Sequence, residues 1–120
     1  MRYHRLVVGA LILGACSPAR AFTDDVNATP TIAEAERFIA DAQRAGADSL
    51  ATGAITAARQ ALEAARGFEQ RGARGRAQLE ARRAQAEARY ARATAERQVA
   101  EREQTRAREA LAAIPPRGAR

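Results

Sequence analysis

The feature that most constrains the fold is an uninterrupted stretch near the C-terminus. From Arg76 to Ala113 the chain runs for 38 residues without glycine or proline. Because those two residues are the strongest helix breakers, their absence from an alanine-rich stretch predicts one long helix. At a rise of 1.5 Å per residue this helix would be about 57 Å long. Pro115 and Pro116 stop it, and residues 115–120 are expected to form a disordered tail.

The alanines of this helix fall into two sets that start on opposite sides of it. The first set alternates spacings of four and three and comprises Ala77, Ala81, Ala84, Ala88, Ala91 and Ala95. The second set repeats every seven residues and comprises Leu79, Ala86, Ala93, Ala100, Ala107 and Ile114. We expect the earlier helices to cover the first set, which leaves the second, from Leu79 to Ala107, as a candidate interaction face. The alternative is that alanine there is only a good helix former at exposed positions.

Two shorter helices are predicted ahead of the long one. The first begins near Thr31, where Thr31 and Glu34 form a capping-box pattern, and ends at Gly46, a residue suited to a left-handed C′ position. The second begins at Thr52, which is predicted to be its N-cap. Because only residues 47–51 connect them, we expect these two helices to lie antiparallel as a hairpin.

Three glycines separate this hairpin from the long helix. They are Gly67, Gly72 and Gly75, and each costs about 1 kcal/mol relative to alanine inside a helix. The arginine-glycine run at 71–76 resembles RNA-binding segments, but one copy is interpreted as a charged turn, and no nucleic-acid partner is expected. The chain is therefore predicted to be all-α, with a short antiparallel helical hairpin followed by one long helix. Residues 31–114 would form this three-helix or coiled-coil-like domain.

The N-terminus has the pattern of a secretory signal, with basic residues followed by an apolar run. That run is about half of the ~20 residues that span a bilayer as a helix. It ends in Leu13, Gly14, Ala15 and Cys16, which resemble the bacterial lipobox. The lipobox implies removal of residues 1–15 as a signal peptide and attachment of lipid to the sulfur and new amino group of Cys16. A plain signal peptide or an N-terminal anchor with a chance cysteine remains the alternative.

Lipidation would decide where the mature chain resides. Residues 16–30 are rich in turn formers and lack an apolar period, so they are predicted to be a flexible tether behind the lipidated cysteine. The predicted location is the periplasmic side of a bacterial membrane, to which the lipid on Cys16 would anchor the chain. Ser17, directly after the cysteine, resembles the sorting pattern of outer-membrane lipoproteins and favours the outer membrane.

The lipobox and the helix pattern together resemble a family of small alanine-rich bacterial lipoproteins that is classified as a domain of unknown function. The resemblance covers Ile32 to Ala113 and rests on three further features: the first helix ending in Gly46-Ala47, the second opening in Leu50-Ala51, and the regular alanine steps of the long helix. It implies a periplasmic helical hairpin with a long third helix, without an established activity or catalytic residues. The family usually has proline where this chain has Thr52.

The side-chain inventory argues against catalysis. The only histidine, His4, lies in the signal, Cys16 would carry lipid, and all 20 basic residues are arginine. The mature chain would therefore have no histidine, lysine or free thiol. Its carboxylates are scattered among arginines without the spacing of metal ligands. No enzymatic activity, cofactor or metal is expected.

Two functions remain after these exclusions. The first is a structural or adaptor lipoprotein that presents a helix to another envelope protein or to a second copy, because alanine faces permit close helix contact. The second is arginine-mediated binding of an anionic envelope polymer or lipid head group. Residues 1–15 hold two of the 20 arginines and none of the 14 acidic residues, so the mature net charge is +4. That charge is modest for the second function.

The location can be tested at the cysteine. Cys16→Ser should leave an uncleaved precursor or a protein that no longer partitions with the detergent phase, because the lipid acceptor is lost. The measurement is gel mobility together with detergent phase separation of membranes. Processing and partitioning unchanged from the parent chain would contradict the lipobox interpretation.

Overall fold

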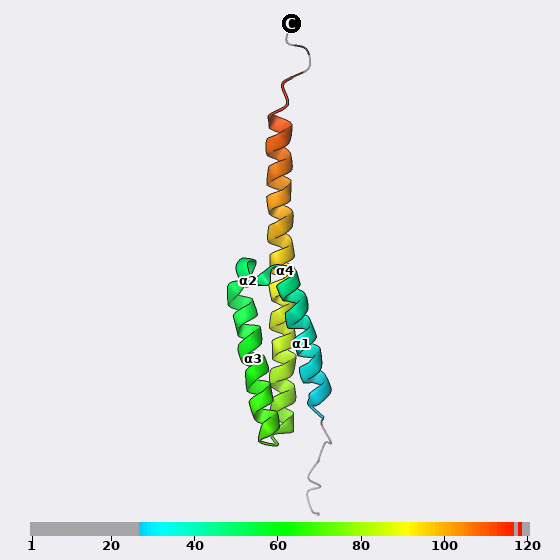
Figure 1. Cartoon of the computed structure of the whole chain (residues 1–120), viewed down its shortest axis with the longest axis vertical. Helices are drawn as coiled ribbons and strands as arrows, with labels where there is room; N and C mark the ends of the chain where they lie inside the picture. The colour runs from blue at the N-terminus through cyan, green and yellow to red at the C-terminus, as the bar shows by residue number, and fades with distance from the viewer. Residues whose placement is uncertain (1–26, 117, 119–120) are drawn as a thin grey trace, which may run out of the picture.

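The computed structural model describes residues 27–116 and residue 118. These residues form four helices and no strand, which confirms the predicted all-α fold with one long helix (Figure 1). The helices are α1 (Thr29–Arg44), α2 (Ala47–Leu50), α3 (Thr52–Gln70) and α4 (Arg74–Ala112).

The long helix α4 is the centre of the arrangement. α1 and α3 run in opposite directions beside its first half, and its second half projects alone beyond them (Figure 1). α1 and α3 each contact α4 more extensively than they contact each other. The first two long helices therefore do not form a hairpin that is packed mainly on itself. The structure is a three-helix bundle in which both of them are held by α4.

The core is built on the first alanine set of α4. All six of these alanines, from Ala77 to Ala95, are fully buried, which confirms that the earlier helices cover this set. Alanine lacks atoms beyond Cβ and loses no rotamer freedom on burial, so neighbouring helices can approach closely at little entropic cost. The facing residues come from the apolar stripes of the other helices: Ile32, Ala35, Ile39 and Ala42 of α1, and Ile55, Ala58, Ala61, Leu62 and Ala65 of α3.

Glycine sets both sharp reversals of the chain. Gly46 has φ +86° after α1, which confirms the left-handed residue predicted there. Gly72 has φ +75° between α3 and α4. The predicted break at the three glycines is narrower than expected, because α3 continues through Gly67 to Gln70 and α4 already begins at Arg74.

The predicted N-caps are wrong at both shorter helices. α1 begins at Thr29, two residues early, and the backbone N–H of Thr29 donates to Asn27 Oδ1 at 3.1 Å. Thr31 thus lies inside the helix and forms no capping box with Glu34. Thr52 is the first residue of α3 rather than its N-cap, because its hydroxyl donates back to the Asp48 carbonyl at 3.0 Å. The one-turn helix α2, which the sequence pattern did not indicate, supplies that acceptor.

The turn after α1 can be tested at Gly46. Gly46→Val should destabilise the fold by about 1–2 kcal/mol, because a β-branched side chain is strongly disfavoured at positive φ. Gly46→Asn should cost less, since asparagine tolerates the left-handed region. The measurement is thermal or chemical unfolding followed by circular dichroism.

A matched control is Gly53→Val. Gly53 lies in α3 without a positive φ, and an added Cβ would meet nothing within 4 Å. This variant should not be destabilised, because valine is a better helix former than glycine. Equal unfolding curves for the valine variants of Gly46 and Gly53 would contradict the left-handed turn.

Candidate functional site

The lipobox residues Leu13, Gly14, Ala15 and Cys16 lie outside the described part of the chain. Their role as a lipidation site therefore stays a prediction. None of the helices between residues 27 and 116 combines the length and apolar character needed to cross a lipid bilayer. Within the same range, no group of three or more histidine, cysteine, aspartate or glutamate side chains is placed to hold a metal ion.

The second alanine set lies on the solvent side of α4. Leu79 is 66% exposed, and Ala86, Ala93, Ala100 and Ala107 are all classed as exposed. The reason is geometric, because α1 and α3 cover the opposite side of the helix, where the first alanine set lies. The predicted interaction face is therefore accessible in the single chain.

Two large side chains that the sequence reasoning left out belong to the same face. Tyr90 follows Ala86 by four residues and is 63% exposed, and Leu111 follows Ala107 by four and is 69% exposed. Residues four apart are neighbours on a helix surface, so this spacing was a usable signal. We call this face the outer seam and define it as Leu79, Arg83, Ala86, Tyr90, Ala93, Arg97, Ala100, Gln104, Ala107 and Leu111.

The outer seam has the spacing of a coiled-coil contact. Its members alternate steps of four and three residues over more than four heptads, as the a and d positions of a coiled coil do. One of the two positions is always leucine or alanine. The other carries Arg83, Tyr90, Arg97, Gln104 and Leu111 in turn. Side chains of very different size and charge at this second position would restrict which surface can pack against the seam.

Beyond the bundle α4 stands alone, and we call residues 99–112 the stem. Every stem residue is exposed, and Ala95 is the last residue of α4 that is fully buried. Gln98 makes the last hydrogen bond to the bundle, donating through Nε2 to the Leu50 carbonyl at 2.8 Å. A helix of this length is marginal in water by itself. The stem therefore depends on continuity with the bundle or on a partner.

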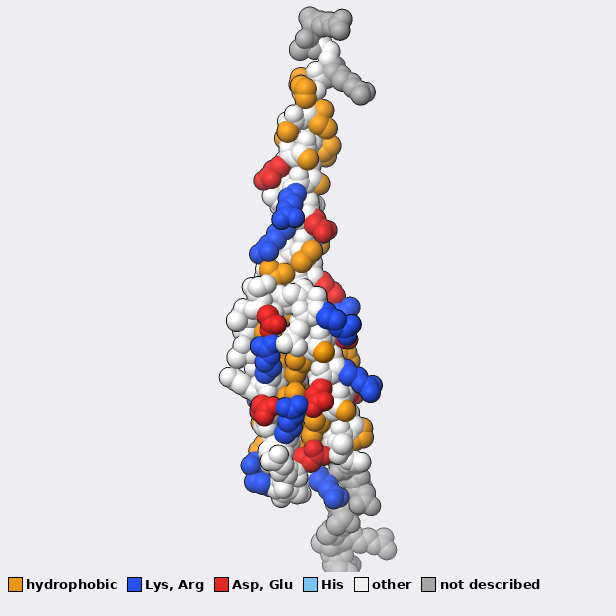
Figure 2. All heavy atoms as spheres, in the orientation of Figure 1, with side chains coloured by type: hydrophobic (Ala, Val, Ile, Leu, Met, Phe, Trp, Pro, Cys, Tyr) orange, Lys and Arg blue, Asp and Glu red, His pale blue; other side chains and the backbone are white. Residues whose placement is uncertain are grey.

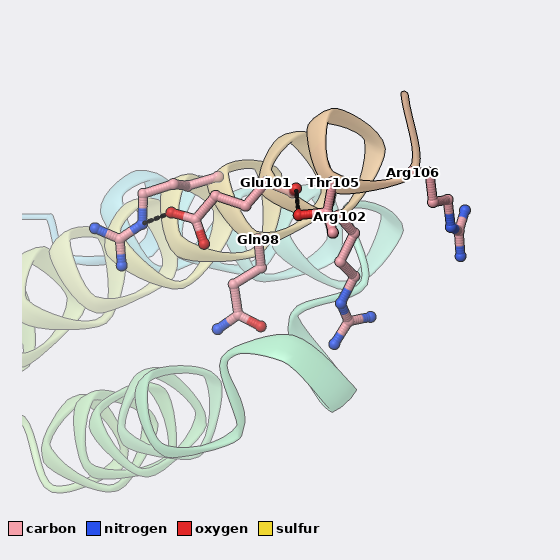
Figure 3. A pocket seen from close by; sticks show the side chains of 6 residues that line it. Gln98, Glu101, Arg102, Thr105 and Arg106 are labelled. Carbon is pink, nitrogen blue, oxygen red and sulfur yellow. Dashed lines mark hydrogen bonds and ion pairs between the residues drawn. The ribbon is translucent and has the colours of Figure 1, made fainter. Parts of the chain in front are cut away.

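A groove lies where the stem leaves the bundle (Figure 3). It has a volume of about 490 Å³, and all its lining residues belong to α4: Arg97, Gln98, Glu101, Arg102, Thr105 and Arg106. Three of the six are arginines and one is a glutamate, so the groove is charged and open to solvent. It lacks the apolar, enclosed lining typical of a small-molecule site.

Polar contacts also join α1 to its neighbours. Gln85 of α4 donates through Nε2 to the Thr31 carbonyl at 3.0 Å. Arg66 of α3 reaches Glu36 of α1 at 2.7 Å, and that hydrogen bond raises the pKa of the Arg66 guanidinium. Exposed ion pairs of this kind contribute little stability.

No protein-family model, curated protein or solved structure matches the chain. The resemblance to alanine-rich lipoproteins consequently remains a prediction from the sequence.

Proposed function

We propose that the chain is a lipid-anchored adaptor of the bacterial cell envelope that uses the outer seam of α4 as its interaction surface. The observation that carries this proposal is the division of α4 into two faces. One is buried against α1 and α3, and the other, from Leu79 to Leu111, is exposed among the residues that the structure describes. The anchored end would be Cys16, on the periplasmic side of a membrane, with the outer membrane favoured.

The shape of the molecule supports an adaptor. The bundle occupies only the first half of α4, and the stem extends beyond it as a single helix (Figure 1). A three-helix domain needs one buried face on each helix, and this chain carries a second apolar period that its own fold does not use. Apolar side chains also gather toward the C-terminal end of the stem, as Figure 2 shows. Such a helix is suited to docking against another helical surface.

The side-chain inventory supports a non-catalytic role. After removal of residues 1–15 the chain would retain no histidine and no lysine, and Cys16 would be blocked by lipid. Histidine, lysine and cysteine are among the residues that commonly act as nucleophiles or as acid–base groups near neutral pH. The implied partners are the membrane, through the lipid, and an envelope protein or a second copy, through the outer seam.

A second candidate function is binding of an anionic envelope polymer or lipid head group. The groove at the base of the stem favours it, because Arg97, Arg102 and Arg106 lie within six lining residues. Glu101 partly offsets them, since its carboxylate lies 3.7 Å from Arg97 Nε. Salt separates the two functions. Binding through arginine weakens steeply as ionic strength rises, whereas apolar packing along the seam does not.

The proposed function can be tested with a charge in the seam. Ala93→Glu should abolish capture of partners in the envelope, because it places a carboxylate in the middle of a close helix contact. Helicity and melting of the single chain should stay nearly unchanged, since Ala93 is exposed. The measurement is crosslinking in membranes, combined with sedimentation of the purified chain.

The matched control is Ala40→Glu, which places the same charge at an exposed alanine of α1. It should leave partner capture intact. If Ala93→Glu also retained full capture, the outer seam would be only a solvated helix surface, and the adaptor function would lose its support.

A further inference from the structure

We propose that the outer seam binds a second copy of this chain with the two α4 helices antiparallel. The two-fold axis would cross the contact at the level of the peptide bond between residues 91 and 92. This inference rests on the proposed function only because it uses the same face of α4. It adds the identity of the partner, which is a second copy of the chain. It follows from three properties of the described residues: side-chain size along the seam, charge beside the seam, and the bare stem.

Side-chain sizes along the seam are complementary to themselves in this register. In an antiparallel coiled coil each a position faces a d position of the other helix. The axis between residues 91 and 92 places Tyr90 against Ala93 of the second copy, and Arg83 against Ala100. It likewise places Arg97 against Ala86, and Gln104 against Leu79. Each long side chain that bears a polar group thus meets leucine or alanine, and no two arginines face each other.

The charges on one flank of the seam are also self-complementary. The residues at this flank are Arg82, Arg89, Glu96 and Glu103, all at seven-residue intervals. The proposed register pairs Arg82 with Glu103 and Arg89 with Glu96, and two-fold symmetry makes each pair occur twice. Such flanking charges set partner choice and orientation in coiled coils.

Two of the four flank residues lack an ion-pair partner within the described part of the single chain, and the other two already contact neighbouring side chains. Arg82 and Glu103 are exposed, and neither takes part in an ion pair among residues 27–116. The Arg89 guanidinium stacks 4.2 Å from the centroid of the Phe38 ring of α1, so its pair with Glu96 of the second copy would form beside that contact. Glu96 already holds Arg92 of its own helix at 2.7 Å, so the pair with Arg89 would add a second cation to that carboxylate.

The opposite flank carries one like-charge contact, and the seam arginines offset it. Glu80 would lie near Glu101 of the second copy. Each has an arginine of the seam beside it in its own helix, Arg83 at 3.8 Å from Glu80 and Arg97 at 3.7 Å from Glu101. The cluster formed by the two copies would then hold two carboxylates and two guanidinium groups, which leaves it without net charge.

A parallel pair in register satisfies only part of these charges, because Arg82 would face Glu87 and Glu103 would face Arg108, but other contacts would be repulsive. It would place Arg83 against Arg83 and Arg97 against Arg97 in the centre of the contact. It would also bring Glu96 next to Glu101 on the flank. Like charges at such positions oppose pairing, so the sequence selects the antiparallel orientation.

Antiparallel pairing also gives the stem the contacts that it lacks in the single chain. Residues 99–109 of one copy would lie along residues 74–84 of the other, which form the outer side of the bundle. α1 and α3 lie on the far side of α4 and leave this approach open. Because α1 and α4 begin at the same end of the bundle (Figure 1), the α1 helices of the two copies would begin at opposite ends of the dimer.

Reciprocal charge reversals test this register. Arg82→Glu should weaken self-association of the full chain by roughly tenfold, because two attractive pairs become repulsive. Glu103→Arg should do the same. An equimolar mixture of the two variants should associate as well as the parent chain, because both 82–103 pairs of the mixed dimer are attractive, one with the original polarity and one with the polarity reversed. The measurement is sedimentation equilibrium of each variant and of the mixture, with circular dichroism to verify folding.

Matched controls lie on the other side of the stem, where the bundle face of α4 continues. Arg102→Glu and Glu109→Arg make the same changes at exposed residues away from the seam, and they should not affect association. A monomeric parent chain, or weakened variants whose mixture does not recover, would overturn the proposal. In a parallel dimer the mixture would not recover, because position 82 would face Glu87. Retained capture of another envelope protein by a monomeric chain would overturn the antiparallel dimer and leave the proposed adaptor function standing.

Discussion

Close packing of the first alanine set of α4 against α1 and α3 is the interaction on which the structure depends. The six alanines from Ala77 to Ala95 bring three backbones together, and a few larger side chains such as Ile39, Ile55 and Leu62 fill the space between them. Each alanine buries little apolar area, so the stability of the contact comes from its length and regularity. Where this set ends, the bundle ends too, and α4 continues alone.

This use of α4 determines what remains for function. With one side committed to the core, the outer seam and the stem are the surfaces of α4 left for a partner. They share a heptad pattern that α1 and α3 do not cover. The charges on one flank of it are basic toward the start of α4 and acidic toward its end. Specific binding does not require an enclosed apolar pocket, because the order of large, small, basic and acidic side chains along one helix can select a partner and its orientation.

Much of this fold follows from residue spacing. The bounds of α4, the buried alanine set and the left-handed Gly46 could be predicted, because each depends on local rules of helix formation and termination. The N-caps at Thr31 and Thr52 were predicted wrongly, because Asn27 and the one-turn helix α2 supply the local hydrogen bonds there instead. α1 and α3 pack mainly on α4 and less on each other. The sequence could not predict this, because all three helices carry similar alanine stripes and periodicity does not show which stripes pack together. The exposed face was predicted, but Tyr90 and Leu111 were missed because only the alanine period was followed.

The most direct test of this account is hydrogen exchange along α4 in a dilute sample of the full chain, where association is negligible. If alanine packing holds the helix, amides of residues 77–95 should exchange only through global unfolding, and amides of the stem should exchange much faster through local opening. Uniformly slow exchange from residue 77 to residue 112 would contradict the account, because it would mean that intrinsic helix propensity and local ion pairs stabilise α4 without help from α1 and α3.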